Sequence, residues 1–248
     1  DWDNDGVADI VFGTYTGPKS KGIYVSLFDS LTGKLDAPQL AAEMKSPSFL
    51  AVHPNGRSLY AVGEATTVGD TRQGGVTAFA IEPGGKLKAL NTQPSGGSGP
   101  CHLALDAAGR LLVTANYGNG SVGALPVRED GTLGAPVCTV QHVGSSVNKQ
   151  RQEGPHAHCA NLSPDGRFAL VCDLGLDRVM VYRLGANERA LTANDPAFGT
   201  VAPGSGARHL AFSRNGKFVY VVNELISSVT TVRWDAKRGA MAEVQTVS

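Results

Sequence analysis

The chain has 248 residues, of which 42% are hydrophobic, and its 22 basic side chains balance 22 acidic ones. A pI near 7.2 without a basic stripe argues against a nucleic-acid surface, and no apolar run reaches the length of a membrane span. We therefore expect neither a nucleic-acid partner nor a membrane. The 31 glycines and 13 prolines are typical of a chain with many tight turns.

The first ten residues, DWDNDGVADI, carry aspartates at the spacing of a calcium-binding loop, namely Asp1, Asp3, Asp5 and Asp9. Position twelve, however, is Phe12 instead of glutamate, and no helices flank the segment. We favour a solvated polar N-terminal segment over residues 1–10, with bound calcium as the alternative. Because the chain starts without methionine, a signal peptide would lie outside this sequence.

Four similar hairpins are predicted along the rest of the chain. Each consists of an alternating apolar run, a turn that ends in Gly-Arg or Gly-Lys, and a second apolar run. Their turn glycines, Gly56, Gly109, Gly166 and Gly216, are 53, 57 and 50 residues apart. We expect the hairpins over residues 48–64, 101–117, 158–174 and 208–224.

Each hairpin is followed by a third strand-like run and a shorter fourth one, for example GGVTAFAI and then KLKAL. Four strands in a repeat of roughly 50 residues predict an all-β propeller, with a Greek-key sandwich as the alternative. No convincing helical stretch is longer than QLAAEM. With a leading repeat near the N-terminus, we expect about five blades in a domain over residues 11–248 that is incomplete at its C-terminal end.

Residues equally far from a hairpin turn lie side by side, so the two ends of each hairpin meet at the rim opposite the turn. The matching positions before the turns hold Ser48, Cys101, His158 and Arg208. Those after the turns hold Glu64, Tyr117, Leu174 and Glu224, preceded by Gly63, Asn116, Asp173 and Asn223. The hairpins are alike in their apolar middles and differ at these ends, which indicates a site at the rim. We expect Arg208 beside Glu224, and His158 at the matching place in the blade before.

Many short motifs, in this order, resemble the lactonase family of seven-bladed propellers, which includes bacterial 6-phosphogluconolactonase and the fungal carboxy-muconate lactonising enzyme. They run from about residue 11 to residue 248 and include FGTYTG, PSFLAVHPNGRSLYAVGE, RQEGPHAHCANLSPDGRFALVCDL and PGSGARHLAFSRNGKFVYVVNEL. The resemblance implies seven blades, two of them outside this sequence, and a lactone chemistry that needs neither metal nor cofactor.

The resemblance also implies a catalytic site in the central cleft, made of His156 and His158 from PHAH, Arg208 from G-x-R-H and Glu224 from N-E-L. Ala207 stands where the family usually has proline. A further arginine that the family contributes to the cleft lies outside this sequence. Four other rim residues are expected to bind substrate, namely Glu64, Asn116, Asp173 and Asn223.

Lactone hydrolysis needs a nucleophilic water, a cation or donor for the oxyanion, and an acid for the leaving ring oxygen. We assign these tasks to Glu224, Arg208 and His158, respectively, with bidentate binding of a substrate phosphate as the alternative for Arg208. A structural ion pair is the alternative for Arg208 and Glu224, and a metal pair or a plain turn for the two histidines. We expect no metal, because the H-x-H spacing has no evident third ligand.

Other polar residues are expected to have structural roles. His102 and His209 directly follow the rim residues Cys101 and Arg208 in the sequence. Their side chains are therefore expected on the other face of the strand, where they should pack or hydrogen-bond. Asp173 either orients a histidine or caps a turn. The cysteines form no C-x-x-C pair, and we expect Cys159 and Cys172 to be free and buried close together on one hairpin.

The expected function is hydrolysis of a sugar lactone, namely 6-phospho-D-glucono-1,5-lactone to 6-phosphogluconate, in the pentose phosphate pathway of glucose metabolism. The alternatives are a cycloisomerase-type lactonisation of a muconate-like substrate and a non-catalytic propeller that binds a partner. The polar rim favours an enzyme, because interaction platforms more often expose aromatic and arginine hot spots. We expect the complete protein to be a cytoplasmic monomer that acts on a small-molecule lactone, with an exported form left open.

Overall fold

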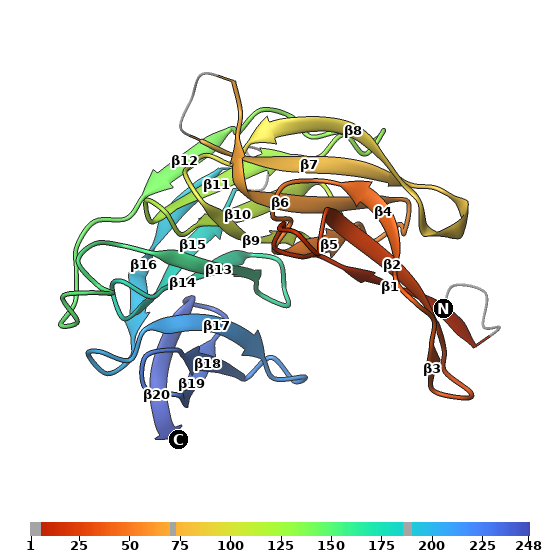
Figure 1. Cartoon of the computed structure of the whole chain (residues 1–248). Coiled ribbons are helices and arrows are strands. Elements are labelled where there is room, and N and C mark those ends of the chain that lie inside the picture. Colours follow the sequence, from red (N-terminus) through yellow and green to blue (C-terminus); the bar gives the residue numbers. More distant parts are fainter. Residues whose placement is uncertain (1–5, 70–72, 186–189) are drawn as a thin grey trace.

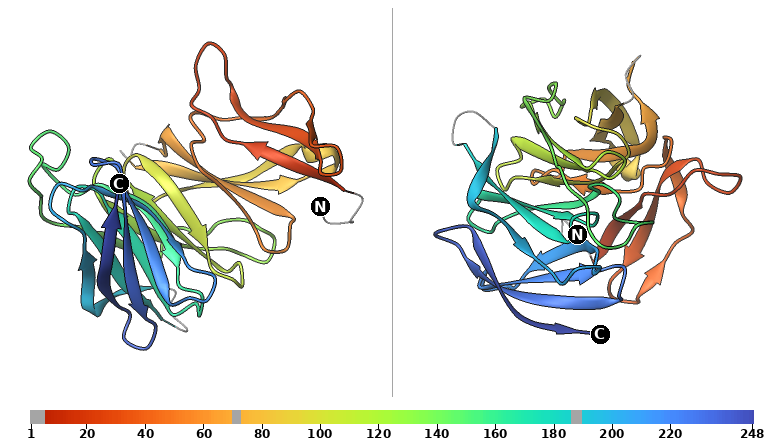
Figure 2. Two further views of the ribbon diagram at one scale, coloured as in Figure 1. Left: turned by 90° about the horizontal axis from the view of Figure 1, so that it is seen from below. Right: turned by 90° about the vertical axis from the view of Figure 1, so that its left-hand side faces the viewer.

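In the computed structural model, the chain forms five four-stranded antiparallel sheets that follow one another around an axis in chain order (Figure 1). The structure describes residues 6–69, 73–185 and 190–248. The first and last sheets lie at the two ends of the resulting arc, as the further views show (Figure 2). This arrangement confirms the predicted all-β propeller with five blades covered. None of the described residues belongs to a helix long and apolar enough to span a bilayer.

The strands have the following bounds. The first sheet contains β1 (Val7–Phe12), β2 (Gly22–Asp29), β3 (Lys34–Leu35) and β4 (Gln39–Glu43). The second contains β5 (Leu50–Val52), β6 (Ser58–Thr67), β7 (Gly74–Ile81) and β8 (Leu87–Pro94), with the 3-10 turn η1 (Pro83–Gly85) before β8. The third contains β9 (Pro100–Leu105), β10 (Leu111–Asn116), β11 (Ser121–Pro126) and β12 (Cys138–Gln141). The fourth contains β13 (Ala157–Leu162), β14 (Phe168–Asp173), β15 (Arg178–Leu184) and β16 (Leu191–Thr200). The fifth contains β17 (Ala207–Phe212), β18 (Phe218–Asn223), β19 (Ser228–Asp235) and β20 (Ala240–Val247).

The N-terminal part differs from the sequence-based expectation. Strand β1 begins at Val7, within the segment expected to precede the propeller, and Asp9 is paired with Leu27 of β2 rather than placed in a loop. The other aspartates of the suggested calcium loop, Asp1, Asp3 and Asp5, lie outside the described residues. The helix-forming stretch near residues 39–44 provides strand β4, because pairing with β2 outweighs local propensity.

The four predicted hairpins are present as β5–β6, β9–β10, β13–β14 and β17–β18. Their turn glycines have φ values between 66° and 70°, a conformation that other residues adopt only at a cost. The first strands of these hairpins lie innermost, where β9 contacts β13 and β13 contacts β17. Four apolar clusters fill the spaces between successive sheets. Packing of adjacent sheets through these clusters therefore fixes the relative positions of the hairpin ends that form the rim.

Three inner hairpins end at the rim in a β-bulge. The pairing register skips Cys101 in β9, His158 in β13 and Arg208 in β17. A bulge takes one side chain out of the regular alternation and re-aims it. The sequence predicted these three residues at the rim, together with Ser48. The bulges therefore set the direction of side chains that differ from one repeat to the next.

Candidate active site

Arg208 and Glu224 meet at the rim of the fifth sheet, as predicted. Nε of Arg208 lies 2.8 Å from Oε2 of Glu224, and the two side chains are 46% and 28% exposed. The Nε–H of Arg208 donates to Nε2 of His158 across 3.2 Å. Adjacent sheets thus bring three of the four expected catalytic residues into direct contact, facing solvent.

Arg151, which was not predicted, completes this cluster. It lies in the loop between β12 and β13, and its Nη2 donates to Oε1 of Glu224 at 2.6 Å. The same nitrogen lies 3.3 Å from the hydroxyl of Tyr117, to which it also donates. The sequence signal was the position of Arg151 at the start of RQEGPHAH, but a long loop leaves its direction undetermined. Glu224 is therefore held between two guanidinium groups.

The charge balance of this cluster favours an anionic ligand. Partial burial by itself would raise the pKa of Glu224, but the hydrogen bond and charge of Arg151, and then the charge of Arg208, lower it below its ordinary value. Glu224 is therefore ionised near neutral pH. Two arginines around one carboxylate leave a net positive charge, and guanidinium groups bind phosphate and carboxylate through paired hydrogen bonds.

His158 is held as a hydrogen-bond acceptor. Burial, followed by the charge of Arg208, lowers the pKa of His158 to about 4. Because Nε2 of His158 accepts the hydrogen bond from Arg208, the neutral ring carries its proton on Nδ1. This Nδ1 is buried and has no hydrogen-bond partner. In this arrangement Nε2 of His158 is placed to accept a proton. The expected role of His158 as the acid for the leaving ring oxygen stays a prediction.

Tyr117 organises the two histidines of the PHAH motif. The ring of His156 stacks on Tyr117 with centroids 4.4 Å apart, and its Nδ1–H donates to the Tyr117 carbonyl at 2.9 Å. The ring of His158 meets Tyr117 edge-on at 5.6 Å. Since Arg151 also contacts the Tyr117 hydroxyl, this tyrosine touches three residues of the cluster.

Two expected substrate-binding residues, Asn116 and Asn223, have no exposed surface. Asn116 Nδ2 donates to the Ser95 carbonyl at 3.3 Å, and Asn223 Nδ2 donates to Ser228 Oγ at 3.0 Å. Both residues end the second strand of an inner hairpin. The structure therefore places them behind the rim, where they hold the following turns, and not at its surface.

Asp173, a third expected substrate-binding residue, is also fully buried and orients a histidine, one of the two roles left open. Burial, with the charge of Asp173, raises the pKa of Tyr182, whose phenol donates to Nε2 of His142 at 2.8 Å. Nδ1 of His142 in turn donates to Oδ2 of Asp173 at 2.5 Å. Oδ1 of Asp173 accepts the backbone N–H of His156 at 2.8 Å. This buried chain fixes the backbone that leads into the two rim histidines.

Glu64, the fourth expected substrate-binding residue, remains at the rim. Burial raises the pKa of Tyr15, and the nearby carboxylate of Glu64 raises it further. One carboxylate oxygen of Glu64 is buried without a hydrogen-bond partner. Nearby, burial raises the pKa of Cys101 to about 12, so its thiol stays protonated and donates to the His158 carbonyl at 3.3 Å.

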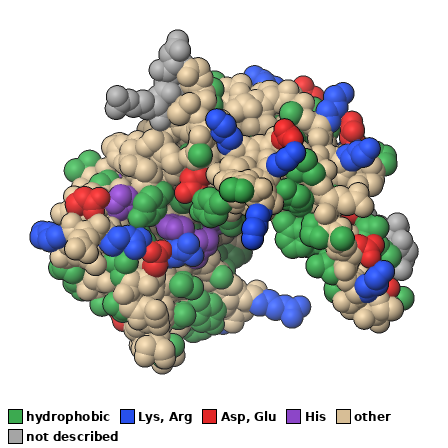
Figure 3. All heavy atoms as spheres, in the orientation of Figure 1, with side chains coloured by type: hydrophobic (Ala, Val, Ile, Leu, Met, Phe, Trp, Pro, Cys, Tyr) green, Lys and Arg blue, Asp and Glu red, His purple; other side chains and the backbone are tan. Residues whose placement is uncertain are grey.

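The predictions for the remaining histidines and cysteines are confirmed. His102 and His209 make packing and ring contacts, with the ring of His102 tilted by 31° against Phe49 at a centroid distance of 3.8 Å. Cys159 and Cys172 are free, buried and paired across β13 and β14. Figure 3 shows several histidine side chains gathered with basic and acidic ones in the hollow between the sheets.

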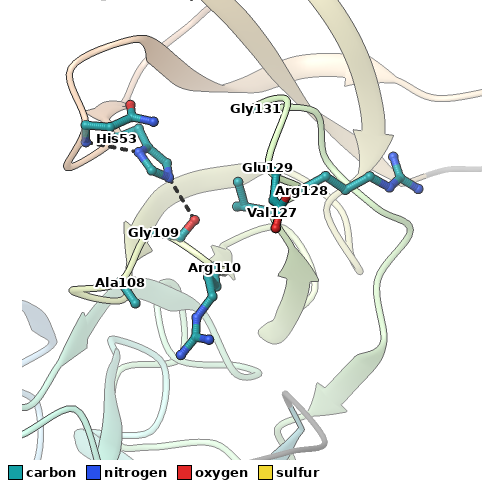
Figure 4. A pocket seen from close by; sticks show the side chains of 9 residues that line it. His53, Ala108, Gly109, Arg110, Val127, Arg128, Glu129 and Gly131 are labelled. Carbon is teal, nitrogen blue, oxygen red and sulfur yellow. Dashed lines mark hydrogen bonds between the residues drawn. The ribbon is translucent and has the colours of Figure 1, made fainter.

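A surface pocket of about 610 Å³ lies at the hairpin turns, away from the rim cluster (Figure 4). Its lining includes His53, Gly109, Arg110 and Arg128. His53 donates through Nε2 to the Gly109 carbonyl at 2.9 Å and accepts the backbone N–H of Asn55 at Nδ1, 3.1 Å away. Both ring nitrogens of His53 are therefore engaged in hydrogen bonds to the backbone of the two turns.

Comparison with known proteins identifies the family of this chain. The family model described as "Lactonase, 7-bladed beta-propeller" matches residues 9–248. The chain is 37% identical to the 6-phosphogluconolactonase of Bacillus subtilis over 95% of this chain and 65% of the relative. It is 34% identical to the 6-phosphogluconolactonase of Formosa agariphila over 88% of this chain and 62% of the relative.

A solved structure agrees with these matches. The periplasmic gluconolactonase of Pseudomonas aeruginosa superposes with a TM-score of 0.88 at 36% identity, over 97% of this chain and 68% of that one. The chain spans less than two thirds of the length of the two curated relatives. Its sequence and its sheet arrangement match the same fold family, and the chain belongs to the lactonase family of seven-bladed β-propellers.

Proposed function

We propose that the protein hydrolyses a sugar lactone, with 6-phospho-D-glucono-1,5-lactone as the substrate and 6-phosphogluconate as the product. The observation that carries this proposal is the cluster in which Glu224 bridges Arg151 and Arg208 beside His158. The names of the matched relatives support the same reaction. The proposed reaction uses only protein side chains and water.

In the proposed reaction, a water molecule attacks the lactone carbonyl and Nε2 of His158 takes its proton. Arg208, released from His158 when substrate binds, stabilises the oxyanion that forms on the carbonyl oxygen. The ring C–O bond then breaks, and the protonated His158 returns the proton to the leaving oxygen. His158 thus serves first as base and then as acid, while Glu224 takes a different role from the one first assigned to it.

Glu224 and Arg151 hold the substrate and the catalytic arginine in place. Glu224 fixes the orientation of both guanidinium groups through its two carboxylate oxygens. The side chain of Arg151 is 42% exposed, so it is available to bind the substrate phosphate. His156 supports the site from its stack on Tyr117.

We also propose that the whole protein acts as a cytoplasmic monomer. The four free cysteines are consistent with a reducing compartment. The matched Pseudomonas aeruginosa protein is periplasmic, so fractionation of cells that express the protein is the direct test of location.

The test of the proposed activity is lactone hydrolysis by the whole protein on phosphorylated and unphosphorylated gluconolactone. We expect faster turnover of the phosphorylated substrate, and a loss of about 10²–10³ in rate on Arg208→Ala. Arg214→Ala is the matched control, because Arg214 is exposed in the turn at the other end of the same hairpin. Equal rates for the two variants would contradict the proposal.

A further inference from the structure

A second group of ligand-type side chains lies next to the rim and takes no part in the proposed reaction. His102 of β9, Cys159 of β13 and His209 of β17 come from the innermost strands of three successive sheets. Their ligand atoms all lie within 4.8 Å of one another. Among the described residues, this is the one group of three or more His, Cys, Asp or Glu side chains that converges in this way.

The spacing of these atoms suits a tetrahedral metal centre. With metal–nitrogen distances of about 2.0–2.1 Å and a metal–sulfur distance of about 2.3 Å, the nitrogen and sulfur ligands stand about 3.5 Å apart. Sγ of Cys159 and Nε2 of His102 are 3.7 Å apart. His209 is only half-buried, so its side chain has room to make the small approach that completes the set.

The surroundings hold two of the ligands in place. His102 is 5% exposed and packs against the ring of Phe49, while Cys159 is fully buried. Nδ2 of Asn161 donates to Sγ of Cys159 at 3.2 Å, the kind of outer hydrogen bond that supports a metal-bound ligand. Such preorganisation lowers the cost of binding an ion.

Binding at Nε2 of His102 requires the tautomer with the proton on Nδ1. One contact opposes this tautomer, because the backbone N–H of Ala160 points at Nδ1 from 3.4 Å. An N–H hydrogen bond is usually about 2.9–3.0 Å long, so this contact is weak and little energy is lost when the tautomer changes.

We propose that His102, Cys159 and His209 form a binding site for zinc or a similar borderline-soft transition metal ion. Imidazole and thiolate select such ions, whereas calcium and magnesium require oxygen ligands. On binding, the Cys159 thiol releases its proton to solvent and the thiolate coordinates the ion. Three protein ligands leave a fourth position for water, on the side of the half-buried His209.

The proposed site differs from the H-x-H pair for which a metal was considered in the sequence. It uses one residue from each of three sheets, so a bound ion ties β9, β13 and β17 together at the axis. Its consequence is structural, since an ion that binds only the folded protein raises the melting temperature. The proposal does not depend on lactone hydrolysis.

Titration of the metal-free protein with Co²⁺ tests the site without an activity assay. We expect visible absorption bands of tetrahedral Co²⁺ together with a near-ultraviolet thiolate-to-cobalt band, both displaced by Zn²⁺, and a higher melting temperature with Zn²⁺. Absence of the thiolate band at saturating Co²⁺ would overturn the proposal.

Two cysteine variants provide the matched comparison. Cys159→Ser should lose the thiolate band and weaken Zn²⁺ binding by at least about 100-fold. Cys172→Ser alters the neighbouring buried thiol on the paired strand, outside the ligand group, and should keep both. If Cys159→Ser does not fold, His209→Ala at its half-buried position should weaken Zn²⁺ binding to a similar degree. Unchanged Zn²⁺ affinity in a folded Cys159→Ser or His209→Ala protein would refute the site.

Discussion

The Nε–H group of Arg208 donates to Nε2 of His158 across 3.2 Å, from one propeller sheet to the next. A cation that donates to the imidazole keeps the ring neutral and marks Nε2 as the acceptor. In the proposed reaction, this contact must break for Arg208 to reach the oxyanion and for His158 to reach the water. The resting structure thus pairs the two groups that the reaction separates.

Replacing His158 should therefore affect catalysis far more than folding. We expect His158→Ala to lower lactone turnover by about 10²–10⁴, the usual contribution of a positioned acid–base group. His156→Ala should be milder, because His156 is held by its stack on Tyr117 and its bond to the Tyr117 carbonyl. Steady-state rates, with thermal melts of the same samples, check both variants. A larger loss in His156→Ala would reverse the assignment.

Arg151→Gln should raise KM for the phosphorylated lactone more than for the unphosphorylated one. The reason is that the side chain of Arg151 is 42% exposed, and a guanidinium group binds phosphate through paired hydrogen bonds. Lys149→Gln is the control, since Lys149 is exposed in the same loop. Equal KM changes for the two lactones would show that Arg151 does not bind the phosphate.

The same variant should change how stability depends on pH. Because Arg151 lowers the pKa of Glu224, the pair stabilises the fold above the ordinary pKa of a glutamate, near 4.5, and loses this effect as the pH falls through the lowered value. The pair is partly exposed, so we expect a difference of no more than about 1 kcal/mol between wild type and Arg151→Gln at pH 7. Urea unfolding at pH 7 and at pH 3 measures it. A difference that grew in acid would contradict this account.

Tyr182→Phe should loosen the support of the rim histidines. The change leaves Nε2 of His142 buried without its donor, which costs about 1–3 kcal/mol of folding free energy. Because His142 and Asp173 hold the backbone N–H of His156, amide exchange should rise around residues 154–158. Hydrogen exchange and denaturant unfolding check these effects. Unaltered exchange in that loop would show that the buried chain does not brace it.

Two turn glycines separate backbone strain from steric overlap. Gly166→Ala adds a methyl group at φ 68° with no atom within 4 Å, so it should cost only about 1 kcal/mol. Gly109→Ala has a nearly identical φ of 67°, but its methyl group would overlap the ring of His53. We expect it to cost about 1–3 kcal/mol more, as overpacking does. Similar melting temperatures for the two variants would exclude the overlap.

The fold was predictable because each repeat is specified by a local sequence pattern. Alternating apolar runs around Gly56, Gly109, Gly166 and Gly216 specify hairpins without reference to the rest of the chain. Counting outward from these glycines also placed Arg208 beside Glu224, because hairpin arms have a fixed geometry. The motifs that resemble the lactonase family then indicated the chemistry.

The details of the site required the tertiary structure, because they depend on contacts between sheets and on burial. Arg151 reaches Glu224 from a loop whose course no periodicity specifies. Asn116, Asp173 and Asn223 occupy rim positions in the sequence, yet packing of the sheets leaves them no exposed surface. His102, Cys159 and His209 are separated by 57 and 50 residues along the chain and converge only when three inner strands stack around one axis.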